Sequence, residues 1–326
     1  MGATNLAPFF PYIGMEEIMK KVIIFGVGGF VGNYLAQEFL AHDYQVYGSD
    51  IVECVKLDER VHYRQADLLD AGNVKQVIED IAPDVIVNLA AISSVGMSWG
   101  MPQKTIEVNV VGALNIMEAA RTLPQSPRIL FVGSSEEYET TEADIDENIP
   151  LNANNPYGIS KMTQENFAKL YRERYGMQVY CVRPFNHTGI GQKDTFVLPS
   201  FCKQVAEIEK TGKQGRMQVG NLTAIRDFSH VKDIVRAYRM IVESDRCDRI
   251  YNVGSGQAYS IREMLDYIIS LCSQKVTVEV DPARVRPVDT PRICCDNRLI
   301  QAELGWQPEY TIWDAVKEMY QYYVEH

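Results

Sequence analysis

The sequence predicts an α/β protein whose core is a doubly wound parallel sheet, followed by a smaller C-terminal α/β lobe. From Lys20 onward, short apolar runs rich in β-branched residues alternate with stretches of helical periodicity. Continuous apolar strands between amphipathic helices are typical of a parallel sheet covered on both faces. A glycine-rich turn between the first strand and the first helix points the same way. No Pro/Gly-rich linker divides the 326 residues, so the second lobe is expected to join the sheet closely.

The individual elements follow from these patterns in chain order. The strands expected in the sheet cover residues 21–26, 44–50, 84–90, 128–134 and 178–184, with a short third strand just before Asp67. The helices expected between them cover residues 31–41, 73–81, 105–121 and 157–175. Beyond residue 186 the pattern loosens. Helices at 197–210, 231–243 and 260–272 are expected there, mixed with short strands at 217–219, 250–253 and 276–280.

Composition argues against several classes of protein. The net charge of −11 disfavours a nucleic-acid scaffold, because phosphate binding depends on a basic surface. No run of about 18 apolar residues is present, so no membrane span is expected. Residues 1–18 lack the basic and apolar regions of a signal peptide and are expected to form a poorly ordered leader. The seven Cys and five His have no disulfide or metal-site spacing, which fits a reducing cytoplasm.

The first strand runs into a glycine-rich turn, GVGGFVG at residues 26–32, and a helical pattern follows directly. Glycine here permits a tight turn, close backbone approach to a pyrophosphate and close packing of the helix on the strand. The free N–H groups of the helix N-terminus then face the phosphates. Asp50 ends the second strand, where a carboxylate accepts hydrogen bonds from the adenosine ribose. This context predicts a bound dinucleotide rather than an incidental glycine turn.

Asp50 also indicates which dinucleotide is bound. A carboxylate there repels a 2′-phosphate, and no basic residue follows directly, so NAD is favoured over NADP. NADP stays possible because Arg60 or Arg64 can fold over the site. Asp67, after the third strand, has two interpretations that the sequence does not separate. It contacts the adenine amine, or it is a helix N-cap.

Three side chains are predicted to form an acid/base centre. Tyr157 and Lys161 are four residues apart, which places them on one helical face. An ammonium beside a phenol lowers the pKa of the phenol, so that Tyr157 can exchange a proton with a substrate oxygen near neutral pH. Ser134 ends the fifth strand, and the carboxyl ends of parallel strands face the ligand crevice. Its hydroxyl can therefore bind the same oxygen, which separates this pattern from an ordinary pair on a helix surface.

Six segments occur in a characteristic order along the chain: the glycine turn, NLAA (88–91), NVVG (109–112), VGSSEEY (132–138), YGISK (157–161) and RPFNH (183–187). This set resembles the extended short-chain dehydrogenases/reductases, the NAD-dependent epimerase/dehydratase family, over nearly the whole chain from Met19 onward. The resemblance implies a catalytic triad of Ser134, Tyr157 and Lys161, with Lys161 also holding the nicotinamide ribose. It implies a cofactor site formed by Gly26, Gly29, Phe30, Val31, Gly32, Asp50, Asp67, Leu68, Leu89, Ala90, Ala91, Asn109, Tyr157, Lys161 and Pro184.

The resemblance also divides the chain. Residues 19–186 are expected to form the Rossmann-type dinucleotide domain, with later segments interleaved, and residues 187–326 are expected to form mainly the nucleotide-sugar lobe. Within the family, segments such as FNHTGIGQ (185–192), VGNLTAIRDFSHVKD (219–233) and RPVDTP (286–291) are most similar to the GDP-4-keto-6-deoxy-mannose reductases, with the GDP-mannose 4,6-dehydratases as close relatives.

By this resemblance Asn186, Arg226 and Arg286 lie in the substrate site of the C-terminal lobe. An arginine fork suits the oxygens of a diphosphate. Two other interpretations stay open: a surface ion pair between Arg226 and Asp227, and a solvated basic loop around Arg286.

Glu136 bears most directly on the reaction. If the fifth strand continued that far, Glu136 would share the side of Ser134. A 4,6-dehydratase needs such a carboxylate to remove the C5 proton, whereas a simple reductase does not. The similar reductases carry a Glu at this place too, and a polar loop acid or substrate hydroxyl acceptor is an equal interpretation. The Thr-Gly-Ile-Gly stretch at 188–191 and the Glu136-Glu137 pair favour the reductase.

The sequence therefore predicts reduction of the C4 ketone of a GDP-4-keto-6-deoxyhexose, giving a GDP-D-rhamnose type product. The alternatives are a 4,6-dehydratase, a 4-epimerase and, in a different class, a dinucleotide-binding sensor without activity. The resemblance also implies a homodimer formed through the helices at 105–121 and 157–175. Apolar residues there, such as Val108, Val111, Leu114 and Met117, are equally explained as ordinary core.

Overall fold

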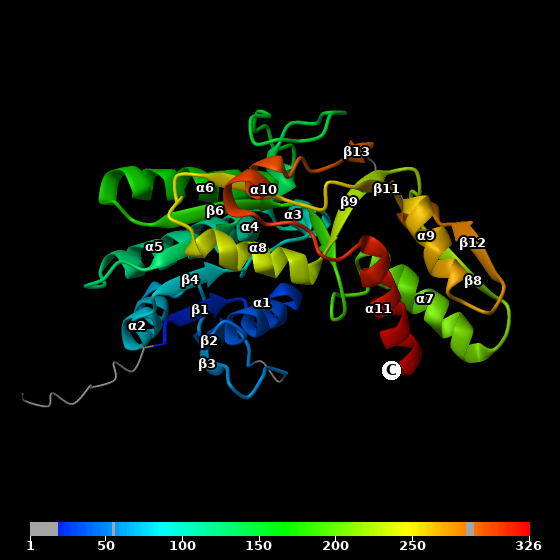
Figure 1. The fold of residues 1–326 in the computed structure, drawn as a ribbon, viewed down its shortest axis with the longest axis horizontal. Coiled ribbons are helices and arrows are strands. Elements are labelled where there is room, and N and C mark those ends of the chain that lie inside the picture. Colours follow the sequence, from blue (N-terminus) through cyan, green and yellow to red (C-terminus); the bar gives the residue numbers. More distant parts are fainter. Residues whose placement is uncertain (1–18, 54–55, 285–289) are drawn as a thin grey trace, which may run out of the picture.

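The computed structural model describes residues 19–53, 56–284 and 290–326 (Figure 1). The predicted leader and Arg286 lie outside the described residues. A seven-stranded sheet in the order β10-β6-β5-β4-β1-β2-β3 forms the centre, and every pair of neighbouring strands in it is parallel. Its strands are β1 (Lys21–Phe25), β2 (Gln45–Asp50), β3 (His62–Gln65), β4 (Val85–Asn88), β5 (Arg128–Val132), β6 (Val179–Pro184) and β10 (Ile250–Val253). The predicted doubly wound α/β fold is confirmed.

Helices cover both faces of the sheet because its strands are apolar on both sides. Alternate residues of β1 point in opposite directions, so that Val22 and Ile24 join one buried cluster while Ile23 and Phe25 join another. The first cluster packs against α1 (Phe30–Leu40), α8 (Val231–Glu243) and α10 (Arg298–Leu304). The second packs against α2 (Ala71–Ile81), α5 (Gly112–Arg121) and α6 (Pro156–Tyr175).

The helix expected at residues 105–121 is not a single α-helix. It consists of α4 (Pro102–Ile106), a π-helical turn η1 (Glu107–Val111) and α5, preceded by α3 (Val95–Gly100). A π-turn inserts an extra residue and so changes which side chains share a face. As a result the four apolar residues proposed for an interface have different surroundings: Met117 is in the core, Val111 is exposed, and Val108 and Leu114 are half-buried.

The second lobe lies at one end of the sheet and has its own core (Figure 1). It contains α7 (Val197–Thr211), α9 (Ile261–Ser270) and α11 (Ile312–Glu325), together with the parallel pair β8 (Gly215–Val219) and β12 (Val276–Val280). A small sheet of β7 (Asn186–Thr188), β9 (Ile225–His230), β11 (Ala258–Ser260) and β13 (Arg292–Ile293) joins the lobe to the site. Two 3₁₀ turns complete the described elements, η2 (Ser135–Glu137) and η3 (Pro282–Arg284).

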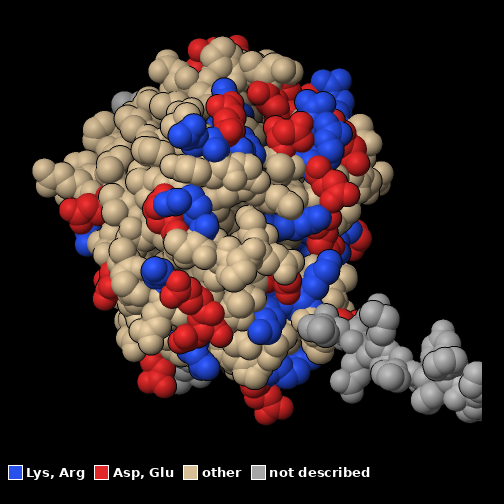
Figure 2. All heavy atoms as spheres, turned by 90° about the vertical axis from the view of Figure 1, so that its left-hand side faces the viewer, with Lys and Arg blue, Asp and Glu red and all other residues tan. Residues whose placement is uncertain are grey.

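Charged side chains of both signs are mixed over the face shown in Figure 2. Neighbours of opposite sign form ion pairs, such as Arg121 with Glu118 on α5. Arg128 reaches Asp245 in the same way. No helix in the described part of the chain combines the length and apolar composition needed to cross a bilayer.

Candidate active site

The glycine turn after β1 builds a compact entry to α1. Gly26 has a left-handed φ of +81°, and a side chain there would meet the backbone N of Ala90 at 2.7 Å. A side chain on Gly32 would meet the carbonyl oxygen of Val27 at 2.5 Å. Both positions therefore require glycine, because the contacting atoms are backbone and cannot move aside.

The N-terminus of α1 fits the pyrophosphate of a dinucleotide. Its N-cap is Gly29, which has no side chain to cap the helix, and no acidic residue occupies the first turn. The N–H groups of Phe30, Val31 and Gly32 thus carry the partial positive charge of the helix without a protein carboxylate to neutralise it. Phe30 stacks on His187 with ring centroids 6.3 Å apart, which brings the turn against β7.

Asp50 lies at the carboxyl end of β2 beside this turn. Its carboxylate accepts hydrogen bonds from the N–H of Gly28 (3.1 Å) and the N–H of Ile51 (2.8 Å). Arg60, which could have reached a 2′-phosphate, is held by Asp58 through Nε (2.9 Å) and Nη2 (2.8 Å). Arg64, the other arginine expected near a 2′-phosphate, donates to the carbonyl of Tyr63 (3.0 Å), and the residues present fit a nicotinamide dinucleotide.

Asp67 is not a helix N-cap. The N-cap of α2 is Asp70, which accepts a hydrogen bond from the N–H of Asn73 at 3.0 Å. Asp67 accepts one from the N–H of Leu69 at 2.9 Å, within the loop between β3 and α2. The capping interpretation of Asp67 is wrong, since the helix begins three residues later than it requires.

The remaining predicted cofactor residues surround the same edge of the sheet. Leu89, Ala90 and Ala91 form the loop after β4, and Pro184 ends β6. Leu68 is buried and faces Gly112. Asn109 lies in the π-turn and is fully engaged: it pairs with the backbone of Ile92 and donates to the Ser160 hydroxyl at 2.8 Å. The sequence assigned Asn109 to the cofactor, and in the structure its side chain orders the loop after β4.

The structure brings Ser134, Tyr157 and Lys161 together. Lys161 Nζ lies 5.9 Å from the centroid of the Tyr157 ring, one helical turn away on α6. The pKa of Tyr157 is raised by burial, contrary to the expectation that Lys161 lowers it, and a side-chain hydrogen bond with Ser134 opposes the rise. Burial lowers the pKa of Lys161 to about 8. The Lys161 ammonium donates to the Val132 carbonyl at 2.7 Å, which fixes it at the end of β5.

Glu136 is not positioned by strand alternation, as the sequence suggested. Strand β5 ends at Val132, and η2 carries Glu136, so the strand does not continue to this residue. The Glu136 carboxylate accepts a hydrogen bond from Asn155 Nδ2 at 2.9 Å. Asn155 caps α6 through its other amide atom, which accepts from the N–H of Gly158 at 2.9 Å. One side chain therefore ties Glu136 to the helix that carries Tyr157.

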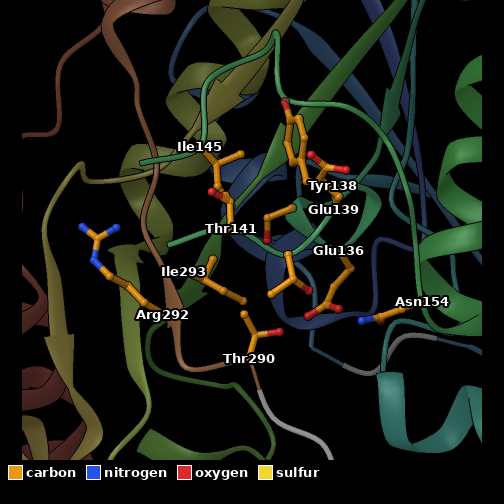
Figure 3. Close-up of a pocket in the computed structure, with 11 residues that line it drawn as sticks. Glu136, Tyr138, Glu139, Thr141, Ile145, Asn154, Thr290, Arg292 and Ile293 are labelled. Carbon is orange, nitrogen blue, oxygen red and sulfur yellow. The ribbon is translucent and has the colours of Figure 1, made fainter. Parts of the chain in front are cut away.

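A cleft next to the triad extends from Glu136 toward the C-terminal lobe (Figure 3). In Figure 3 the Glu136 carboxylate points toward the Asn154 side chain. Arg292 lies at the other side, and its guanidinium binds Asp144 Oδ1 (2.6 Å) and the Glu142 carbonyl (3.1 Å). The cleft is lined by Ser135, Glu136, Tyr138, Glu139, Thr140, Thr141, Ile145, Asn154, Thr290, Arg292 and Ile293.

The predicted substrate residues Asn186 and Arg226 lie on neighbouring strands of the small sheet. Asn186 is opposite Phe228 in the register of β7 and β9, two residues from Arg226. Arg226 donates to the carbonyls of Ile225 (2.8 Å) and Pro291 (3.5 Å). Asp227 is fully buried and accepts hydrogen bonds from Ser255, Gly256 and Cys295, so the surface ion pair between Arg226 and Asp227 is wrong.

Several residues around the triad were not foreseen from the sequence. Asn155 carried a signal, because Asn followed by Pro156 is typical of a helix N-cap and first helical position. Glu137 carried none: it is an acid, yet it is completely buried. No group of three His, Cys, Asp or Glu suited to a metal ion occurs among the described residues.

Comparison with known proteins agrees with this geometry. The family model for GDP-mannose 4,6 dehydratase matches residues 23–319. The chain belongs to the GDP-mannose 4,6-dehydratase family. A GDP-6-deoxy-D-mannose reductase from Pseudomonas aeruginosa is 29% identical over 91% of this chain and 95% of its own length. A GDP-mannose 4,6-dehydratase from Vibrio cholerae is also 29% identical, over 92% of each protein.

Solved structures of similar proteins have the same overall fold. The structure of RMD from Pseudomonas aeruginosa complexed with NADPH is 26% identical and covers 94% of this chain and 98% of that one, with a TM-score of 0.81. A UDP-glucose 4-epimerase from Brucella ovis in complex with NAD is 25% identical, with the same 94% and 98% coverage and a TM-score of 0.82. The predicted family, fold and class of cofactor are confirmed by these relatives.

Proposed function

We propose that this chain reduces the C4 ketone of a GDP-4-keto-6-deoxyhexose to give a GDP-D-rhamnose type product. The observation that carries the proposal is the way Glu136 is held. Its carboxylate is hydrogen-bonded to Asn155, whereas the Tyr157 and Ser134 side chains are hydrogen-bonded to each other. A ketone reduction needs a proton donor at one oxygen and no second base, which is what this arrangement supplies.

The residues divide the work as follows. Ser134 binds the ketone oxygen and orients it toward the Tyr157 hydroxyl, which gives its proton to the forming alkoxide. Lys161 stabilises the tyrosinate that remains, because its ammonium lies on the same side of α6. Asn186 and Arg226, with Arg286, bind the nucleotide-sugar diphosphate from the C-terminal lobe.

A reduced nicotinamide dinucleotide supplies the hydride when it is bound. The N–H groups at the start of α1 and the glycine turn hold its pyrophosphate, and Asp50 holds the adenosine ribose. Lys161 orients its nicotinamide ribose. The engagement of Arg60 by Asp58 supports NADH as the working form.

Replacing Asp50 by Ala tests this choice of cofactor. The wild-type chain is expected to prefer NADH, because the Asp50 carboxylate repels a 2′-phosphate. Removing one such charge should lower the NADH-over-NADPH preference in kcat/KM by about tenfold or more. The measurement is initial velocity with each cofactor, and Asp266→Ala, at an exposed position on α9 of the second lobe, is the matched control. An unchanged preference in Asp50→Ala would assign the selectivity to another residue.

Replacing Glu136 by Gln tests the reaction. In a reductase this variant should keep its turnover within about tenfold of wild type, because Gln still bonds to Asn155 and no proton leaves C5. In a 4,6-dehydratase, loss of the base should cost about 100-fold to 10,000-fold. Turnover of the 4-keto sugar and of GDP-mannose is measured for both proteins. Collapse of activity in Glu136→Gln contradicts the reductase proposal.

A homodimer is the expected assembly, through the side of the molecule formed by α3, α4, η1 and α6. Ile106, Val111, Ile159 and Leu170 are all more than a third exposed there. Leu170→Glu should convert the dimer to a monomer in light scattering, because it places a charge in an apolar interface. Lys169→Glu, which introduces the same side chain one position earlier, should leave the mass unchanged. A monomeric wild type would remove this part of the proposal.

A further inference from the structure

Glu137 is hydrogen-bonded to the backbone of the acid/base centre, although no step of the proposed reaction uses it. It is the last residue of the 3₁₀ turn η2, and its side chain is completely buried. Ser134 and Glu137 form a capping box: the Ser134 hydroxyl accepts from the N–H of Glu136 at 3.1 Å, and Glu137 Oε1 accepts from the N–H of Ser134 at 2.7 Å. The carboxyl therefore holds the backbone of a catalytic residue.

Glu137 and Lys161 hold two ends of the same three-residue segment. Lys161 Nζ donates to the carbonyl of Val132, and Glu137 Oε1 accepts from the N–H of Ser134. Gly133 lies between them, and a side chain there would come within 2.4 Å of Glu137 Oε1. Glycine at this position lets the carboxyl lie against the backbone of the segment whose other end is bound by Lys161.

Two polar atoms in this site have no hydrogen-bond partner among the described residues: Glu137 Oε2 and Gln164 Nε2. The other side-chain atom of Gln164, Oε1, accepts from Lys161 Nζ at 3.4 Å. An unpaired buried carboxyl oxygen costs free energy, most of all when it is charged. Gain or loss of the Glu137 proton therefore changes the electrostatic free energy of the neighbouring groups.

The charged and titratable groups that act on Glu137 come from each element around it. They are Lys161, Glu165 and Tyr157 on α6 and Arg183 and Cys181 on β6. Glu136 and Tyr138 are its neighbours in the chain. Arg183 is occupied elsewhere, because it binds both oxygens of Glu165 (3.0 and 2.5 Å) and the Tyr138 hydroxyl (2.8 Å).

Burial raises the pKa of Glu137 to about 8, with the charge of Glu165 adding to the rise and Arg183 and Lys161 opposing it. Burial lowers the pKa of Lys161 to about 8, and Glu137 opposes that fall. Glu137 also acts to raise the pKa of Tyr157. The charge of each group therefore favours the charged form of the other.

We propose that Glu137 is a positioning residue of the acid/base centre, whose buried carboxyl holds Ser134 in place and keeps the proton on Lys161 as the pH rises. The charged form of the Glu137 carboxyl stabilises the Lys161 ammonium and so opposes its loss of a proton. This inference rests on the proposed function only for its effect on turnover.

The direct test measures the protonation of Lys161 without any substrate. Competitive labelling with acetic anhydride, followed by mass spectrometry across a pH series, gives the pKa of Lys161 in the purified protein. Glu137→Gln keeps an acceptor for Ser134 but has no charge, so the pKa of Lys161 should fall by about one unit or more. Glu137→Met, of similar length and also uncharged, should give the same fall and replaces the Gln variant if that protein does not fold.

Two further variants separate charge from structure. Glu137→Asp keeps a carboxyl and should return the pKa of Lys161 toward the wild-type value. Glu147→Gln, which removes another partly buried acid away from Lys161, should leave it unchanged. The proposal is overturned if the pKa of Lys161 is unchanged in both Glu137→Gln and Glu137→Met. It is also overturned if Glu137→Asp shows the same lowered pKa as these uncharged variants.

The same proteins report on turnover. In the reductive direction both Lys161 and Tyr157 must carry protons, so the alkaline limb of the pH–rate profile should move to lower pH in Glu137→Gln. The KM for the nucleotide sugar should change little, because Glu137 lies beneath the triad and does not line the cleft. If the pKa of Lys161 falls in Glu137→Gln but the wild-type protein reduces no 4-keto sugar, the result would support this inference and contradict the proposed function. If the pKa of Lys161 is unchanged in Glu137→Gln and the wild-type protein is an active reductase, the result would support the proposed function and contradict this inference.

Discussion

Tyr157→Phe is expected to lower kcat by about 100-fold to 10,000-fold, because it removes the group that protonates the substrate oxygen. The aromatic ring is kept, so only the hydroxyl group is lost. Cofactor affinity should therefore stay within about threefold of wild type, a free-energy difference of less than about 0.7 kcal/mol. Stopped-flow or steady-state reduction of the keto sugar gives kcat, and fluorescence titration with NADH gives the cofactor Kd.

Tyr180→Phe is the matched control, since Tyr180 is buried in the same sheet and donates its hydroxyl to the Ser244 carbonyl, away from the cleft. It should cost stability but little turnover. If Tyr157→Phe lost cofactor binding as well as turnover, Tyr157 would be acting in binding or structure rather than as the proton donor.

Gly32→Ala is expected to have the second large effect, this time on cofactor binding. The added methyl group would lie 2.5 Å from the Val27 carbonyl oxygen and 2.6 Å from that of Gly26. Neither atom can move without opening the glycine turn, so α1 must shift away from the strand. We expect a loss of about 1–3 kcal/mol in the free energy of unfolding from the strain, and weaker binding of NADH by about tenfold or more.

Gly72→Ala serves as the control for this second variant. Gly72 also lies in the first turn of a helix, but its added methyl group would meet only Asp70 Oδ1 at 3.4 Å, an ordinary contact. Thermal unfolding and calorimetric titration with NADH should leave Gly72→Ala close to wild type. Equal NADH affinity in Gly32→Ala and wild type would show that the turn does not hold the pyrophosphate.

The sheet could be predicted because its strands are apolar on both faces. Runs such as KVIIF and VIVN, buried between two layers of helices, have no polar position to obscure them. Strand β9 was not predicted because its sequence, IRDFSH, is mostly polar. Its central Asp227 is satisfied by backbone groups of Ser255 and Cys295, distant in sequence, which no local pattern reveals. Helix α11 did carry a signal, the capping box of Thr311 and Asp314.

The site shows the same division between local and distant information. The relative position of Tyr157 and Lys161 followed from helical spacing, whereas Ser134, expected at the end of the fifth strand, lies two residues beyond β5 as the N-cap of η2. The place of Glu136 did not, because alternation assumed a strand that ends four residues earlier, at Val132. The burial of Glu137 depends on Gly133, on the ammonium of Lys161 and on the ion pair between Arg183 and Glu165. Such a group of neighbours exists only once the chain has folded.

The most direct test of the central claim is product analysis after two incubations of the purified protein. One contains the GDP-4-keto-6-deoxyhexose with NADH or NADPH, and the other contains GDP-mannose with catalytic NAD or NADP. The reductase proposal predicts cofactor oxidation and a 6-deoxyhexose product in the first incubation, with GDP-mannose unchanged in the second. Formation of a 4-keto product from GDP-mannose, without net consumption of cofactor, would contradict it and identify a 4,6-dehydratase that uses Glu136 as the C5 base.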